Sequence, residues 1–343
     1  MTQGSVSGWK KVLPWLKWPL ALGIIGFLVH KNRDRFIELW QHPIHWEYLA
    51  IGCALCLCSV MLTFLRWYLL VWAQEFQFTP RDALRIGFLG YLFNYIASGS
   101  IGGDVVKGAM LVRRQKDRRL AAVSTVVIDR MLGLVSLMFV GALATVIAEG
   151  EVRDRAIINN VFWIGAAIGL GIVGLMLHPV SSNSRLVHLI TRIPKVGSAF
   201  ADLAQAAAMY QSRRRVVIAG IMIGIMGQFG VISSFYFCAR AVGDPAVLPA
   251  YTTHLLLMPL AELIGFVVPT PGGIGALEFC VQKAYDLAGS SPELGLVAAG
   301  AYRLTSICVA MIGGVYYFTG RDEIKKVLDE DNAEQDARPT DAV

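Results

Sequence analysis

Long, continuous apolar segments are the feature that most constrains how this chain can fold. An α-helix needs about 20 apolar residues to cross about 30 Å of hydrocarbon, and a transmembrane β-barrel would show alternating rather than continuous apolar residues. Only 16% of the 343 residues are charged, against about 25% in a soluble domain. The sequence therefore predicts an all-α polytopic membrane protein and excludes a soluble enzyme. The predicted spans are 14–30, 47–73, 119–148, 157–178, 216–242 and 293–318.

Two further apolar stretches, 83–112 and 251–289, contain breaks that a helix cannot continue through. The first is interrupted at 98–104 (Ser-Gly-Ser-Ile-Gly-Gly-Asp) and the second at 269–275 (Pro-Thr-Pro-Gly-Gly-Ile-Gly). Backbone groups at such breaks must be satisfied by protein or water, because lipid offers no partner. We therefore expect about six transmembrane helices and two re-entrant broken-helix hairpins.

The distribution of lysine and arginine predicts the orientation of the chain. Basic residues concentrate in 113–119 and 181–215, which indicates the cytoplasmic side, whereas 243–250 has no basic residue and suits the outside. The first hairpin then enters and returns at the cytoplasmic face, and 251–289 does so at the outer face. We expect both termini in the cytoplasm, and a location in a bacterial cytoplasmic membrane.

The predicted elements repeat with inverted orientation. A span, an inside hairpin and a span over 47–148 are followed by a span, an outside hairpin and a span over 216–318. Inverted repeats whose broken helices meet near the bilayer midplane are typical of transporters. We expect a single integral membrane domain over 1–320 and an acidic, disordered cytoplasmic tail over 321–343, which lacks aromatic residues.

Charged side chains inside apolar segments are the second constraint, since each costs at least about 2.5–3.5 kcal/mol on insertion scales. Arg66, Arg130 and Arg303 offer forked donors that suit phosphate, and backbone N–H groups at the glycine-rich tips suit a second anion. Asp129 and Arg130 point about 100° apart on a helix, so each needs its own partner.

The acidic residues balance the arginines, or bind an amine or a coupling proton. The alternative is that these groups form ion pairs that only fix helix packing. The candidate headgroup-binding residues are Arg66, Asn94, Gly102, Gly103, Asp104, Lys107, Asp129, Arg130, Glu262, Pro271, Gly272, Gly273, Gly275, Glu278 and Arg303.

No motif indicates catalysis. The sequence contains neither a P-loop nor a G-x-S-x-G motif. The six cysteines lie in apolar segments, and we interpret them as small buried side chains rather than metal ligands. We expect no enzymatic activity, no cofactor and no metal. The net charge of +6 is interpreted as a topology and lipid-contact signal, not as nucleic-acid binding.

The order of the polar residues over about 15–320 resembles the lysylphosphatidylglycerol synthase transmembrane (flippase-like) family. The pattern is Arg66, Asn94, Gly102-Gly103-Asp104-x2-Lys107, Asp129-Arg130-x2-Gly133-Leu134, Pro269-x-Pro271-Gly272-Gly273-x-Gly275-x2-Glu278 and Arg303. Two features depart from the family pattern. The stretch after Asn94 lacks the usual proline, and Lys107 stands where arginine is common.

The resemblance implies translocation of a phospholipid or polyprenyl-linked lipid between leaflets, with a membrane lipid as the substrate. Because 23 residues follow Gly320, we expect no aminoacyltransferase domain of the kind found in bifunctional members. The alternative is a membrane-embedded accessory subunit of a lipid-linked glycosyltransferase or lipid synthase, which would need a partner enzyme. The sequence leaves the identity of the lipid and the oligomeric state open.

Overall fold

The computed structural model describes residues 43–96, 102–115, 118–148, 156–177, 209–267 and 275–319. The predicted first span at 14–30, most of the basic segment 181–215 and the acidic tail at 321–343 lie outside these residues.

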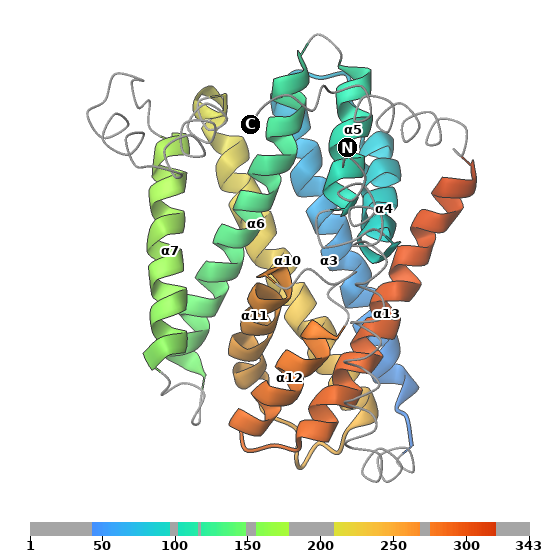
Figure 1. Cartoon of the computed structure of the whole chain (residues 1–343), viewed down its shortest axis with the longest axis vertical. Coiled ribbons are helices and arrows are strands. Elements are labelled where there is room, and N and C mark those ends of the chain that lie inside the picture. Colours follow the sequence, from blue (N-terminus) through green and yellow to red (C-terminus); the bar gives the residue numbers. More distant parts are fainter. Residues whose placement is uncertain are drawn as a thin grey trace, which may run out of the picture.

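Five long helices form the body of the bundle (Figure 1). Each is long and apolar enough to cross a membrane, and their ends differ from the predicted ends by at most two residues. The chain is therefore an all-α polytopic integral membrane protein. The helices are α3 (Trp46–Ala73), α6 (Arg119–Ile147), α7 (Ala156–Leu177), α10 (Arg214–Val242), which follows a 3-10 turn at Gln211–Arg213, and α13 (Pro292–Thr319).

Four shorter helices form two pairs at opposite ends of the bundle (Figure 1). The first pair is α4 (Pro80–Ile96) and α5 (Gly102–Arg114), and the second is α11 (Tyr251–Val267) and α12 (Ala276–Leu287). Both interruptions fall at the glycine-rich breaks in the sequence. The order of one long helix, one helix pair and a second long helix thus occurs twice along the chain.

A side-chain contact joins the two arms at the outer end of each pair. In the first pair, Arg114 Nη1 lies 2.6 Å from Asp82 Oδ1. In the second, the Tyr285 hydroxyl lies 2.7 Å from His254 Nε2. The start of the first arm and the end of the second therefore lie together, as in a hairpin. The re-entrant insertion of the two helix pairs into a membrane stays a prediction.

The connections between helices gather at the two ends as the charge pattern predicts. At one end Arg118 Nη1 donates to the Gln74 carbonyl over 3.0 Å, and Arg213 pairs with Glu75. At the other end Ser290 Oγ donates over 2.6 Å to a carbonyl in the loop after α10. The predicted grouping of these segments is confirmed. Which end faces the cytoplasm stays a prediction.

Each hairpin packs on its own apolar core. Trp67, Ile86 and Leu111 are fully buried between α3, α4 and α5. Phe235 and Tyr285 are fully buried in a second cluster that joins α10 and α12 with α6, α11 and α13. Two separate cores leave the space between the hairpins free for polar groups.

The cysteines depart in part from the sequence interpretation. Cys56 and Cys238 are buried, as expected, but Cys58 and Cys308 are exposed. The expectation of small buried side chains is therefore wrong for these two, because α3 and α13 turn those positions away from the interior of the bundle.

Candidate functional site

A cavity of about 420 Å³ lies inside the bundle, with walls from both hairpins and from α3, α6, α10 and α13. The structure brings eight of the predicted site residues to this cavity. Gly102, Gly103, Gly275 and Glu278 lie at or near the starts of α5 and α12, whereas Pro271, Gly272 and Gly273 lie outside the described residues. The eight are Arg66, Asn94, Asp104, Lys107, Asp129, Arg130, Glu262 and Arg303.

Arg66 on α3 and Asp129 on α6 form a buried ion pair, with 2.7 Å between Nε and Oδ1. Gly133 lies one turn after Asp129 and makes room for the guanidinium, since a Cβ there would lie 3.1 Å from Arg66 Nη2. Gly224 on α10 leaves similar room, because its Cβ would lie 3.2 Å from Arg66 Nη1. This pair ties three helices together in the centre of the bundle.

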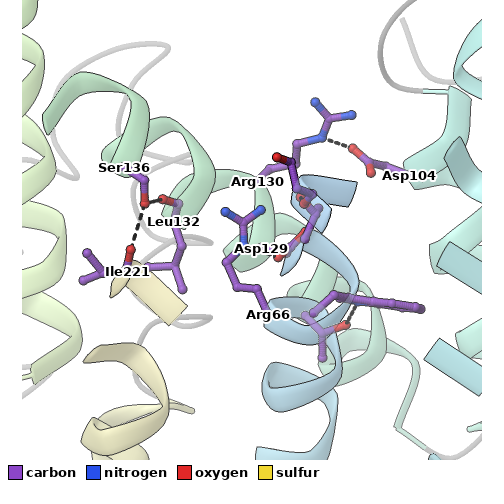
Figure 2. Close-up of polar contacts among 11 residues, drawn as sticks. Arg66, Asp104, Asp129, Arg130, Leu132, Ser136 and Ile221 are labelled. Atoms are coloured by element: carbon purple, nitrogen blue, oxygen red, sulfur yellow. Dashed lines mark hydrogen bonds and ion pairs between the residues drawn. The ribbon is translucent and has the colours of Figure 1, made fainter. Parts of the chain in front are cut away.

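Arg130 turns away from the neighbouring Asp129 and pairs with Asp104 at the start of α5 (Figure 2). The prediction that Asp129 and Arg130 have separate partners is confirmed. The Arg130 side chain is 33% exposed, compared with 10% for Arg66. Arg130 is therefore the more accessible of these two guanidinium groups.

The second half of the chain contains a matching pair. Arg303 Nε on α13 lies 2.9 Å from Glu278 Oε1 in the first turn of α12, and Nη2 lies 3.4 Å from Oε2. Glu278 Oε2 also accepts the Gly275 N–H over 2.7 Å. Gly275 has a φ of 84°, which favours glycine because a Cβ is strained there.

The two pairs occupy equivalent places in the two halves. Asp104 and Glu278 are each the third residue of a hairpin's second arm, and their arginines follow on the next long helix, 26 and 25 residues later. The sequence reasoning selected all four residues but missed their pairing. The sequence did contain a signal for this pairing: Asp104 and Glu278 each precede an arginine by nearly the same number of residues.

The glycine-rich start of α5 serves helix packing. Asn94 Oδ1 on α4 accepts the Gly103 N–H over 2.9 Å, and a Cβ on Gly103 would lie only 2.0 Å from the Gly90 carbonyl oxygen. The N–H groups of Gly103 and Gly275 are thus bonded within the protein. An anion at either tip would have to displace a side-chain acceptor.

Lys107 on α5 is the buried cation of the cavity that lacks a carboxylate partner among the described residues. It is 7% exposed, and its Nζ lies 5.8 Å and 5.5 Å from the ring centroids of Phe64 and Trp67. Such contacts stabilise a cation without using its hydrogen-bond donors. With Arg66 and Arg130 against two aspartates, Lys107 leaves this side of the cavity with one excess positive charge.

Glu262 on α11 is the counterpart of Lys107: a carboxylate of the cavity without a basic partner among the described residues. Its Oε2 lies 3.3 Å from Gln228 Nε2 on α10, and none of its bonds within the described chain comes from a basic side chain. Gln228 was missed by the sequence reasoning, as were Tyr91, Tyr95 and Tyr302, which also line the cavity. A glutamine in the middle of an apolar span was the available signal.

These features define a class: a helical integral membrane protein with two opposed hairpins around a charged internal cavity. Within that class, the chain belongs to the family described as the lysylphosphatidylglycerol synthase TM region, which it matches over residues 15–314. It is similar to a UPF0104 membrane protein of Methanothermobacter thermautotrophicus, with 24% identity over 305 residues that cover 82% of this chain and 88% of the relative. No solved structure matches the chain.

Proposed function

We propose that this protein is a lipid translocase that moves the headgroup of a phospholipid or polyprenyl-linked lipid between leaflets. The headgroup would pass through the cavity while the acyl or prenyl tails stay in the bilayer, and no bond in the lipid would change. The observation that carries the proposal is the excess positive charge around Lys107 inside a membrane bundle. Ionisable groups at membrane depth are expensive, and they mark substrate pathways.

Two groups are suited to hold the phosphate of the headgroup. Lys107 keeps its ammonium donors for a ligand because aromatic rings hold it in place. Arg130 is partly exposed and offers a planar fork. Charge-assisted hydrogen bonds of this kind are about twice as strong as neutral ones. The phosphate would exchange its hydration shell for these donors as it enters the membrane.

The opposed hairpins supply a means of alternating access. Movement of α5 relative to α6 would separate Asp104 from Arg130, and movement of α12 relative to α13 would separate Glu278 from Arg303. Each motion would open the cavity toward one end of the bundle. Rocking of inverted repeats around a central site is a common basis of alternating access.

The test is reconstitution of the purified full chain into liposomes that contain headgroup-labelled fluorescent lipids, followed by a membrane-impermeant quencher. We expect quenching to proceed beyond the outer-leaflet pool for at least one phosphate-containing lipid. Protein-free liposomes are the control. Quenching that stops at the outer-leaflet pool for every lipid would contradict the proposal, and activity only with an added lipid-modifying enzyme would favour an accessory subunit.

A further inference from the structure

Glu262 differs from the other carboxylates around the cavity in what surrounds it. Asp129, Asp104 and Glu278 each lie against an arginine. Within the described chain, Glu262 accepts one long hydrogen bond, from the Gln228 amide. Its other oxygen, Oε1, is buried and has no hydrogen-bond partner among the described residues, and the same is true of Gln228 Oε1. These two neighbouring side chains therefore hold two buried acceptor oxygens that receive no donor from the described residues.

An ionised carboxylate is a poor fit to these surroundings. It would leave both acceptors unsatisfied, and burial of an unpaired charge is among the largest penalties in a protein interior. Both oxygens are buried, so a metal cation or a substrate ammonium could reach them only after the surrounding side chains move. A proton is the cation that needs no space.

The protonated acid matches its neighbour. A carboxylic acid has one O–H donor besides its acceptor oxygens, and a primary amide has both kinds of group. With a proton on Glu262, the O–H can donate to Gln228 Oε1 after an amide rotation while Gln228 Nε2 still donates to the Glu262 carbonyl. The pair then forms two reciprocal hydrogen bonds and satisfies both acceptors.

We propose that Glu262 is a proton-binding site, neutral in the state described here and ionised when the cavity opens. The proton would pass from a hydronium ion, in water that enters at one end of the bundle, to a Glu262 carboxylate oxygen, and it would return to water when the cavity opens at the other end. This cycle would couple headgroup movement to a proton gradient, and the coupling rests on the proposed lipid translocation.

The neighbouring groups point to Glu262 as the carboxyl group that changes its protonation state. Helix α11 packs against α6, α10 and α12, and Tyr302 on α13 lines the same cavity as Glu262. Asp129 and Glu278, the carboxylates on these helices nearest the cavity, are each paired with an arginine, and Gln228 on α10 does not titrate. The titratable and charged groups concerned are Asp129 and Arg130 on α6, Glu278 on α12, Tyr302 and Arg303 on α13, and His254 on α11 itself, which is bonded to Tyr285.

Infrared spectroscopy of the purified full chain in lipid bilayers tests the protonation directly. The carbonyl stretch of a carboxylic acid is separate from the bands of a carboxylate. At neutral pH we expect this band in the wild type and its loss in Glu262→Gln. In Gln228→Met the band should persist but shift to higher wavenumber, because the carbonyl loses its amide donor. Asp244→Asn, which changes an exposed loop acid, is the matched control and should leave the band unchanged.

A wild-type spectrum without the band, or the same band in Glu262→Gln, would overturn the proposal. The coupling is read separately in liposomes, where an imposed pH gradient should change the wild-type transfer rate several-fold and leave Glu262→Gln unaffected. Equal responses of the two proteins would overturn the coupling. If the wild type moves no lipid, the proposed function fails while the infrared result still decides the proton site.

Discussion

At the scale of single residues, the Arg66–Asp129 pair shows how charge is kept inside an apolar bundle. Its atoms lie 2.7 Å apart, and small residues on two helices leave room for the guanidinium. Breaking a buried pair by removing one partner costs about 3–5 kcal/mol, whereas replacing both partners with apolar residues is often neutral. The stability of the pair therefore depends on both partners together.

We expect Asp129→Leu to lower the free energy of unfolding by about 3–5 kcal/mol, since Arg66 remains buried without a partner. The double variant Arg66→Met with Asp129→Leu should recover most of this loss. Denaturant unfolding of the purified proteins in detergent measures both. A double variant no more stable than the single one would show that the two charges do not act as a pair.

Lys107 should affect transport far more than folding. Lys107→Met keeps the buried stem beside Phe64 and Trp67 but removes the charge, so we expect the lipid transfer rate to fall by roughly tenfold to a hundredfold. That range corresponds to one charge-assisted hydrogen bond. Lys283→Met on α12, whose side chain is 60% exposed, is the matched control and should transfer lipid at the wild-type rate. A normal rate in Lys107→Met would remove Lys107 from the headgroup site.

At the scale of the elements, each hairpin depends on how closely its two arms approach. In the first hairpin, Asn94 caps the start of α5, and the backbone of α4 lies where a Cβ of Gly103 would be. At the outer end, Asp82 and Arg114 join the arms. These contacts fix the position of Asp104 and Lys107 relative to the cavity.

Gly103→Ala should therefore destabilise the first hairpin. The new Cβ would lie 2.0 Å from the Gly90 carbonyl, so α4 and α5 must separate, and overpacking typically costs about 1–3 kcal/mol. We expect a lower melting temperature and slower lipid transfer. Gly108→Ala on the same helix, where a Cβ meets nothing within 4 Å, should leave both unchanged. Equal stability of the two variants would contradict the close approach.

At the scale of the whole molecule, the orientation of the two ends in the membrane follows from charge. The end with Arg118 and Arg213 is the basic one, which the positive-inside rule places in the cytoplasm. The opposite end holds the loop around Asp244. In the proposed mechanism, hairpins at both ends of the bundle would give the cavity an entrance from each leaflet.

In a background without cysteines, Arg213→Cys should be protected from a membrane-impermeant thiol reagent in intact cells, and Ala246→Cys should be labelled. Permeabilised cells supply the control, in which both positions should react. Labelling of position 213 together with protection of position 246 would invert the orientation.

The helices of this fold were predictable because length and hydropathy are local properties. The described spans begin and end within two residues of the predicted positions, and the glycine-rich breaks interrupt both hairpins. The contacts of the site were not predictable in the same way. Arg66 and Asp129 are 63 residues apart, and the Glu262–Gln228 contact joins two helices. Such partners depend on how helices are rotated about their axes, which a single sequence does not specify.

Helix α7 lines no part of the cavity and packs chiefly on α6, yet in the predicted topology it decides how the second half of the chain is oriented. After α3 and α6 the polypeptide is back on the side where it began, so a following half would insert in the same orientation as the first. One additional crossing by α7 makes the count odd and turns the second half over. Without α7, the predicted topology would place both hairpins at one face, and the proposed mechanism would lose access from the other leaflet.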